Sequence, residues 1–254
     1  MCTLVLLRRP EADWPLIVGA NRDEMAGRPW LPPARHWPDR PNVVAGLDEI
    51  GGGSWMGVND EGLIAAVLNR TNSLGPADGK RTRGELVLDA LDHADAVDAA
   101  EVLAGIDPDA YRPFNLVIAD NRDAFWLAHR GEGKPELARI PDGLHMITAE
   151  DLDDPRSPRV RRYRPRFAVA QIPEPDKDDW QVWGDLLGDT DPEPGDAASA
   201  MRFGLPIGFG TRSSMLAAVP AIGSKARPAL RFAAVTDQPL AWETILPGLQ
   251  EAAL

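Results

Sequence analysis

The sequence predicts an α+β protein of layered sheets and helices rather than a doubly wound parallel sheet. Short apolar runs occur in pairs separated by hairpin-length turns, which is typical of antiparallel strands. Segments with helical periodicity lie between these pairs, so the expected order is strands, helices, strands, helices, strands. The 254 residues can form one large domain or two small ones, and a single domain over residues 1–254 is the simpler interpretation.

The first expected hairpin pairs residues 2–8 with residues 16–20. Both segments are almost continuously apolar, and the residues between them include prolines and an aspartate that favour a turn centred near Ala12. Antiparallel pairing from that turn brings Cys2 opposite residues 21–23. We therefore expect a thiol, a guanidinium and a carboxylate to lie close together.

A second hairpin is expected between residues 54–58 and 63–68, because residues 59–62 have turn composition. Its far end carries the glycines 51–53 beside Asn69. Consecutive glycines let another chain segment or a ligand approach the backbone closely, although a flexible loop is the commoner explanation.

The helices and later strands follow from spacing and composition. Thr82 and Glu85 have capping-box spacing before an apolar helical face at residues 86–91. We expect further helices over residues 95–103, 159–171 and 180–187, a helix break at Pro165, an exposed loop over 189–198, and strands over 114–119, 125–129, 211–219 and 230–235.

Composition narrows the classes of partner. The net charge of -12 disfavours nucleic acid and anionic membranes as partners. No apolar stretch approaches the ~20 residues needed to span a bilayer, and no export signal is recognisable, so a cytoplasmic location is expected. A single cysteine excludes an internal disulfide and a cysteine zinc cluster, and the four histidines are scattered. We expect neither a metal nor another cofactor.

Six arginines lie close together without an acidic residue between them: Arg156, Arg159, Arg161, Arg162, Arg164 and Arg166. Such a cluster can bind phosphate or carboxylate. A solvated helix face paired with the abundant acidic residues is the favoured interpretation.

Cys2 is the residue with the most chemical potential. Its small side chain permits removal of Met1, which would leave a free α-amine on the residue that carries the thiol. An α-amine has a pKa of roughly 7.7 to 8.0, so its neutral form can accept the thiol proton. A small buried hydrophobe at the start of a strand is the alternative interpretation.

Arg22 and Asp23 are the candidates for assisting this nucleophile. Arg22 would lower the thiol pKa and raise thiolate character, and Asp23 would orient the α-ammonium group. Adjacent strand residues face opposite ways, however, so one must point away from Cys2 unless a bulge intervenes. The structural alternative is a salt bridge that closes the hairpin.

Six short motifs lie in order along most of the chain: Met-Cys-Thr at 1–3, Asn-Arg-Asp-Glu at 21–24, Gly-Ser-Trp-Met-Gly at 53–57, Asn-Arg-Thr at 69–71, Phe-Asn-Leu at 114–116 and Gly-Thr-Arg-Ser-Ser at 210–214. With these motifs the chain resembles the NRDE family, also called the transport and Golgi organisation 2 family. That family is similar to the N-terminal nucleophile hydrolases, which include penicillin V acylase and bile-salt hydrolase.

The resemblance implies a four-layer αββα sandwich with Cys2 at the end of a central strand. By similarity to the acylases, Asp23 would contact the α-amine, Asn69 would help form the oxyanion hole, and Arg212 would support the nucleophile. The acylases separate their Arg and Asp by two residues, whereas Arg22 and Asp23 are adjacent. The remaining candidates are expected to bind substrate: Asn21, Glu24, Gly53, Trp55, Asn115 and Thr148.

Thr148 is a candidate because Ile147-Thr148-Ala149 stands where the family usually has Leu-Ser-Asn, and Ala149 has no amide to donate. The backbone of residues 51–53 is a further candidate for the oxyanion hole. Four tryptophans are candidates for an acyl pocket, although core packing is their usual role: Trp14, Trp30, Trp37 and Trp55.

The expected function is hydrolysis of non-peptide acyl-amide bonds, or acyl transfer, through a Cys2 thioester, acting on a small acyl-amide or lipid-like substrate. The alternative is a non-catalytic carrier or chaperone for a lipid, an acyl-CoA or a haem-like ligand, because eukaryotic relatives in the family are associated with lipid and haem handling. The two differ in whether the α-amine of Cys2 matters.

Overall fold

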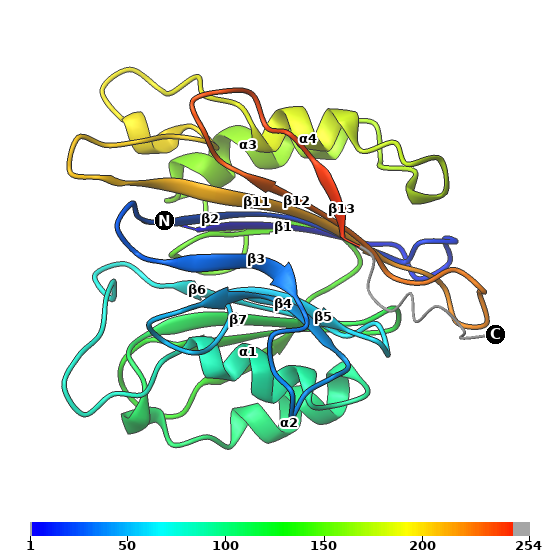
Figure 1. Ribbon diagram of the computed structural model, residues 1–254, viewed down its shortest axis with the longest axis horizontal. Helices are drawn as coiled ribbons and strands as arrows, with labels where there is room; N and C mark the ends of the chain where they lie inside the picture. Colours follow the sequence, from blue (N-terminus) through cyan, green and yellow to red (C-terminus); the bar gives the residue numbers. More distant parts are fainter. Residues whose placement is uncertain (1, 246–254) are drawn as a thin grey trace.

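The computed structural model describes residues 2–245, which form two antiparallel sheets and several helices (Figure 1). The six-stranded sheet has the strand order β10-β1-β2-β11-β12-β13, and the seven-stranded sheet runs β3-β4-β5-β6-β7-β8-β9. The expected α+β class is confirmed.

The elements have the following bounds. The six-stranded sheet comprises β1 (Thr3–Arg8), β2 (Leu16–Met25), β10 (Gly143–Ile147), β11 (Phe209–Val219), β12 (Ala229–Ala234) and β13 (Glu243–Ile245). The seven-stranded sheet comprises β3 (Trp30–Ala34), β4 (Val43–Asp48), β5 (Met56–Asn59), β6 (Ile64–Asn69), β7 (Phe114–Ala119), β8 (Ala124–His129) and β9 (Glu136–Arg139). The α-helices of the described residues are α1 (Gly84–Leu91), α2 (Ala96–Ala104), α3 (Pro158–Val169) and α4 (Gln181–Leu187).

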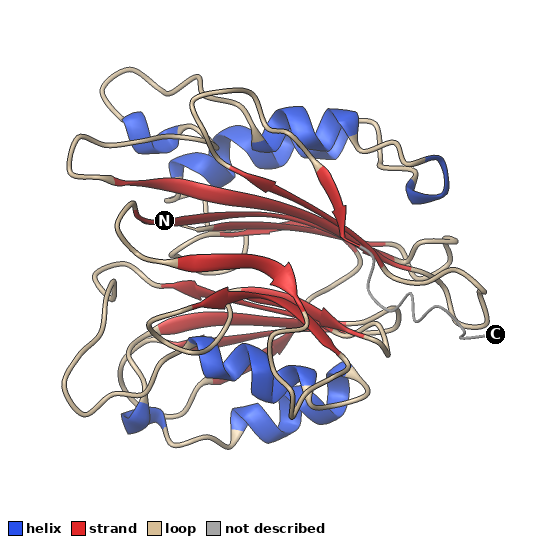
Figure 2. Ribbon diagram, in the orientation of Figure 1, coloured by secondary structure: helices blue, strands red, loops and turns tan. Residues whose placement is uncertain are grey.

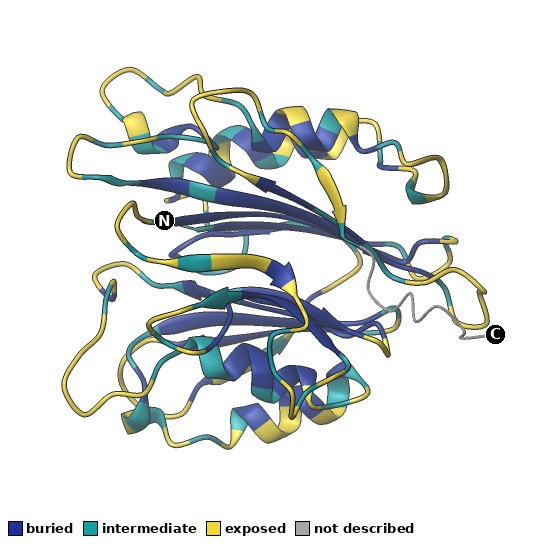
Figure 3. Cartoon of the chain, in the orientation of Figure 1, coloured by how far each residue is buried: buried dark blue, intermediate teal, exposed yellow. Residues whose placement is uncertain are grey.

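The two sheets face each other, with α1 and α2 outside the seven-stranded sheet and α3 and α4 outside the six-stranded one (Figures 1 and 2). Strand β1 shows why its sequence is continuously apolar. Leu4 and Leu6 pack between the sheets, whereas Val5 and Leu7 pack with the residues of α3 and α4. A strand that is covered on both faces needs apolar residues at every position, and β1 is buried along its whole length (Figure 3).

Both expected hairpins are confirmed. In the first, Thr3 pairs with Asn21 and Arg8 with Leu16. In the second, Met56 pairs with Ala66.

The expected break at Pro165 is wrong, since α3 continues through it. A proline removes one backbone hydrogen bond, and the buried side chains of α3 hold the helix against the sheet despite that loss: Arg159, Val160, Tyr163 and Phe167.

Strand β2 continues past its apolar half because β11 pairs with it. Ala218 lies opposite Ile17, and the pairing extends to Phe209 opposite Met25, with a register shift between Thr211 and Ser213. Residues 21–24 are therefore held as strand rather than as turn, beside the start of β1.

Within residues 2–245, no helix combines the length and apolar character that a membrane crossing requires.

Candidate active site

Cys2 lies immediately before β1, an interior strand of its sheet. The Cys2 Sγ is 3.4 Å from the backbone nitrogen of Asp23 and 3.6 Å from its carbonyl oxygen. The side chain is half-buried. The hairpin register thus places the Cys2 thiol against the end of β2, next to Asp23.

The electrostatic environment of the thiol differs from expectation. Burial raises the pKa of the Cys2 thiol, the negative charge of Asp23 raises it further, and the positive charge of Arg22 only partly opposes them. This direction is opposite to the expected gain in thiolate character, because desolvation of the sulfur outweighs the hydrogen bond from the Asp23 backbone and the charge of Arg22. A proton acceptor is needed for the thiol to attack at neutral pH.

Asp23 is tied to helix α3 by a buried ion pair. Its Oδ2 accepts a hydrogen bond of 2.8 Å from Nη1 of Arg159, which also donates to Oγ1 of Thr3 at 2.8 Å. The Arg159 guanidinium stacks on Phe203 at 4.8 Å. Both charged side chains are almost completely shielded from solvent, so Arg159 fixes the orientation of the Asp23 carboxylate.

The sequence did not identify Arg159 as a site residue, because it is one of six closely spaced arginines. The one signal was its spacing from Tyr163 and Phe167, which puts it on the buried face of α3. The other five arginines form ion pairs with acidic residues, as the favoured interpretation predicted: Arg156 with Asp154, Arg161 with Glu193, Arg162 with Asp191, Arg164 with Asp153 and Arg166 with Asp189.

A cavity of about 340 Å³ opens beside Cys2. Six of the predicted site residues line it: Cys2, Arg22, Asp23, Glu24, Trp55 and Asn69. The rest of its wall comes from residues near 48–54, from the segment before α1, and from Arg112. A second, smaller cavity of about 20 Å³ with a mostly apolar wall also reaches Cys2.

Arg22 points away from Asp23, toward the other sheet. Its guanidinium lies 4.4 Å above the ring of Trp55, and its Nη2 is 3.4 Å from Oδ2 of Asp48. Arg28 binds the same carboxylate at 2.6 Å. Burial raises the pKa of Asp48, but hydrogen bonds from Arg28 and the Gly51 nitrogen, with both arginine charges, outweigh it and hold the pKa below its usual value.

Gly53 does not line the cavity, and its role is structural. A Cβ at this position would lie 2.3 Å from the backbone carbon of Gly84 at the start of α1. The next residue, Ser54, donates its backbone N–H to the Gly84 oxygen at 3.0 Å. The close approach expected at these glycines is therefore that of helix α1, which positions one wall of the cavity.

Three further candidates for substrate binding lie outside the larger cavity. The Asn21 amide donates to the carbonyl oxygens of Leu187 and Met201 at 2.9 Å each, and its oxygen accepts from Ser214. These bonds join β2 to the end of α4 and to β11. Asn21 touches only the smaller cavity.

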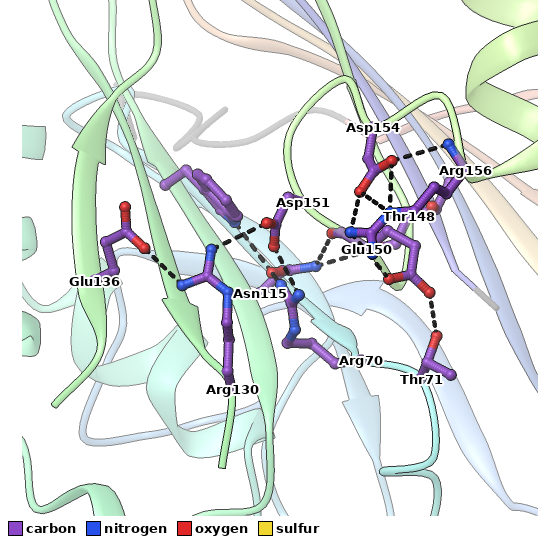
Figure 4. Close-up of polar contacts among 11 residues, drawn as sticks. Arg70, Thr71, Asn115, Arg130, Glu136, Thr148, Glu150, Asp151, Asp154 and Arg156 are labelled. Carbon is purple, nitrogen blue, oxygen red and sulfur yellow. Dashed lines mark hydrogen bonds and ion pairs between the residues drawn. The ribbon is translucent and has the colours of Figure 1, made fainter. Parts of the chain in front are cut away.

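Asn115 and Thr148 belong to a polar network between β7 and the segment after β10 (Figure 4). The Asn115 oxygen accepts from Arg70 at 2.6 Å, and its amide donates to the carbonyl oxygens of Thr148 and Glu150. Neither Asn115 nor Thr148 lines a cavity that reaches Cys2. The network fixes the loop after β10, so the expected contact with substrate is not supported.

Arg212 occupies the register shift of β11. Its guanidinium donates to the carbonyl oxygens of Glu24 and Gly208 at 3.0 Å and 2.7 Å. It is not among the residues that line either cavity, so the expectation that it shares a pocket with Cys2 is wrong. An extra residue in a bulge changes the direction of its side chain, and the sequence carries no signal for the bulge.

Of the four candidate tryptophans, Trp55 lines both cavities and the other three line neither. Trp30 packs against it edge to face, with ring centroids 5.9 Å apart, and does not reach either wall. Trp14 binds Asp176, and Trp37 donates to the Gly52 oxygen. Core packing is therefore the role of three of the four tryptophans.

Solved structures with a similar fold include an acid amidase and a bile acid hydrolase. An N-acylethanolamine-hydrolysing acid amidase orthologue of Caenorhabditis elegans aligns with a TM-score of 0.56 at 12% identity, over 85% of this chain and 92% of that one. A conjugated bile acid hydrolase of Clostridium perfringens aligns with a TM-score of 0.53 at 11% identity, over 96% of this chain and 92% of that one. That structure is of a variant in which the second residue changes from Cys to Ala.

An arginine-to-leucine variant of the same bile acid hydrolase aligns with a TM-score of 0.51 at 11% identity, over 96% and 92% of the two chains. The family model for Transport and Golgi organisation 2 matches residues 1–187, and the chain belongs to that family. Among curated proteins, none matches the sequence significantly.

Proposed function

We propose that the protein hydrolyses non-peptide acyl-amide bonds and uses Cys2 as an N-terminal nucleophile after removal of Met1. The observation that carries the proposal is the position of the Cys2 thiol. It lies at the head of an interior strand, in contact with Asp23, and at the wall of a 340 Å³ cavity that also contains Asn69. Met1 itself lies outside the described residues.

The raised thiol pKa makes a base essential, and the α-amine of Cys2 supplies it. The amine accepts the thiol proton, the sulfur attacks the amide carbon, and the carbonyl oxygen becomes an oxyanion. The α-ammonium then protonates the leaving amine as the C–N bond breaks, which leaves a thioester. Water cleaves the thioester with the amine again as base and restores the thiol. Asp23, oriented by Arg159, holds the α-amine in place.

Asn69 and the backbone of residues 51–53 are our candidates for stabilising the oxyanion. Such a donor acts mainly on the transition state, and its loss costs about 2.7 to 4 kcal/mol in known hydrolases. Asn69→Ala should therefore lower kcat far more than it raises KM. An effect confined to KM would make Asn69 a binding residue instead.

We further propose that the stacked layers are the αββα sandwich of these hydrolases and that residues 1–254 form one domain. The pairing of β2 with β11 supports the single domain, because β11 lies beyond the family match at residue 187. A cytoplasmic location and a lipid-like acyl group on the substrate belong to the same proposal.

The carrier function remains the second candidate, and the raised pKa of Cys2 favours it. A protonated thiol can line a binding cavity for a lipid, an acyl-CoA or a haem-like ligand without reacting. A carrier has no use for a free α-amine and can retain Met1.

Three forms of the protein separate the two functions: the mature chain, the Cys2→Ala variant, and a variant with a lysine inserted between Met1 and Cys2, which blocks removal of Met1. Each is assayed against a panel of acyl-amides and thioesters, and intact mass reports its N-terminus. We expect turnover only in the mature chain. Full activity with the inserted lysine would exclude the α-amine as base, and activity in Cys2→Ala would remove Cys2 from the chemistry.

A further inference from the structure

The larger cavity has an unequal distribution of charge. Six cationic and three anionic side chains line it: Arg22, Arg28, Lys80, Arg81, Arg83 and Arg112 against Asp23, Glu24 and Asp48. In a chain with a net charge of -12, this is a local reversal of sign. The cations that do not pair with Asp48 or Glu24 lie on the wall formed by residues 80–84 and Arg112.

The cations near Cys2 are compensated. Arg28 lies 2.6 Å from Asp48 and 3.9 Å from Glu24, and Arg22 lies 3.4 Å from Asp48 and 4.0 Å from Glu24. Two guanidinium groups thus share two carboxylates. One donor of Arg22, its buried Nη1, has no hydrogen-bond partner among the described residues.

On the wall formed by residues 80–84 and Arg112, Arg81 pairs with Glu85 at 2.7 Å. The other three cations of this wall have no such ion pair with a described residue. Arg83 donates to the carbonyl oxygens of Ser73 and Pro113 at 2.8 and 3.0 Å, and Arg112 donates to those of Leu74 and Asn72 at 2.7 and 3.1 Å. Lys80 donates to the carbonyl oxygen of Asp109 at 2.5 Å.

Within residues 2–245, none of these three cations forms an ion pair with a carboxylate. Carbonyl oxygens satisfy hydrogen bonds but do not neutralise a charge. Burial, together with the positive charge of Arg112, lowers the pKa of Arg83 to about 10. A negative charge placed in this part of the cavity would relieve that repulsion.

We propose that the cavity binds substrates that carry an anionic group, a carboxylate or a phosphate, against Arg83, Arg112 and Lys80. The statement that the amide of the same molecule lies at Cys2 rests on the proposed function. The preferred substrate class is then the N-acyl amino acid or a related acyl-amide with an anionic end, and a neutral N-acylethanolamine is a poor ligand.

Binding to the Cys2→Ala variant tests this proposal without requiring turnover. Isothermal titration calorimetry compares three ligands with one acyl chain: N-dodecanoylglycine, N-dodecanoylethanolamine and the phosphate ester of the latter. Charge-assisted hydrogen bonds should make at least one anionic ligand bind about tenfold more tightly than the neutral one. The anionic ligand with the larger gain in affinity over the neutral ligand identifies the preferred group, carboxylate or phosphate. Added salt should narrow the difference.

Two variants locate the effect. Lys80→Gln removes an exposed charge from the cavity, and Lys134→Gln makes the same change on an exposed lysine that does not line it. The preference for the anion should shrink about threefold in the first and stay constant in the second. Arg112→Gln should shrink it further, and its melting temperature shows whether the loop still folds.

Equal affinities for charged and neutral ligands, no detectable binding of any of the three, or a preference that Lys80→Gln leaves intact would overturn the proposal. Failure of the proposed function looks different. In that case the mature chain turns over no amide, while the Cys2→Ala variant still prefers the anionic ligand.

Discussion

Arg22 and Asp23 are neighbours in sequence but serve opposite sides of the site. The Arg22 side chain reaches Asp48 and Trp55 on the seven-stranded sheet, whereas the Asp23 side chain reaches Arg159 on α3. The alternation of side chains along a strand produces this division. Both residues line the larger cavity, but the Arg22 side chain contacts the seven-stranded sheet and the Asp23 side chain contacts helix α3.

The titration of Cys2 follows from this arrangement. Because burial and Asp23 raise the thiol pKa, the rate of alkylation by iodoacetamide should reach its midpoint at a higher pH than for an unstructured cysteine. Asp23→Asn removes a negative charge and should lower the midpoint, and Arg22→Gln removes a positive charge and should raise it. Mass spectrometry over a pH series measures the rate. A midpoint at or below that of a free cysteine would contradict the burial argument.

At the scale of residues, the sequence identified those that hairpin pairing brings together. The turn near Ala12 was enough to place Cys2 against Asp23, since antiparallel register follows from turn position. It did not identify Arg159 as the partner of Asp23, because that contact joins positions 136 residues apart and depends on how α3 docks.

A buried ion pair between Arg159 and Asp23 joins helix α3 to the site, and its removal should destabilise the protein. Arg159→Met leaves the Asp23 carboxylate in a buried position without this partner, which typically destabilises a protein by about 3 to 5 kcal/mol. Urea denaturation measures the loss. Arg162→Met is the matched control, because Arg162 lies on the same helix as Arg159 and pairs with the exposed Asp191 in a loop. This substitution should leave stability unchanged. Equal effects of the two substitutions would show that the buried pair has no special role.

The contact between Gly53 and α1 gives a second prediction at the scale of elements. In Gly53→Ala the new methyl group would overlap the backbone of Gly84, so the helix must shift and stability should fall by about 1 to 3 kcal/mol. Gly27→Ala is the control, because a Cβ there meets nothing within 4 Å. Thermal unfolding of both variants checks the expectation. A Gly53→Ala protein as stable as Gly27→Ala would mean that the glycine is not needed for packing.

Elements with strong local patterns were predictable, and those defined by their neighbours were not. The helix α2 has an Asp95 cap and the strands β7 and β8 form a hairpin, so their sequences carry start and stop signals. Strand β3 contains two prolines and shows a register shift against β4. Strand β10 follows from pairing with β1, which joins distant parts of the chain. Local sequence does not encode such pairing.

At the scale of the molecule, the described residues after the family match supply three of the six strands of one sheet: β11, β12 and β13. Strand β11 runs between β2 and β12, so a chain that ends at residue 187 would leave β2 without that neighbour. Its buried apolar residues and backbone donors would then face water. We expect residues 1–187 alone to aggregate or to lack a cooperative unfolding transition by circular dichroism. A cooperative transition in this fragment would contradict the single-domain proposal.

The long separation between Asn21 and Ser214, 193 positions apart, also sets the order of events during synthesis. At about 5 to 20 residues per second, the ribosome needs roughly ten seconds or more after making Cys2 before it has made Arg159 and β11. Contacts between such distant segments also form slowly. The nascent N-terminus is therefore open to methionine aminopeptidase long before the site closes around it. Through that interval the thiol is in water and has the reactivity of an ordinary cysteine, so an unfinished chain is more easily alkylated or oxidised than the folded protein.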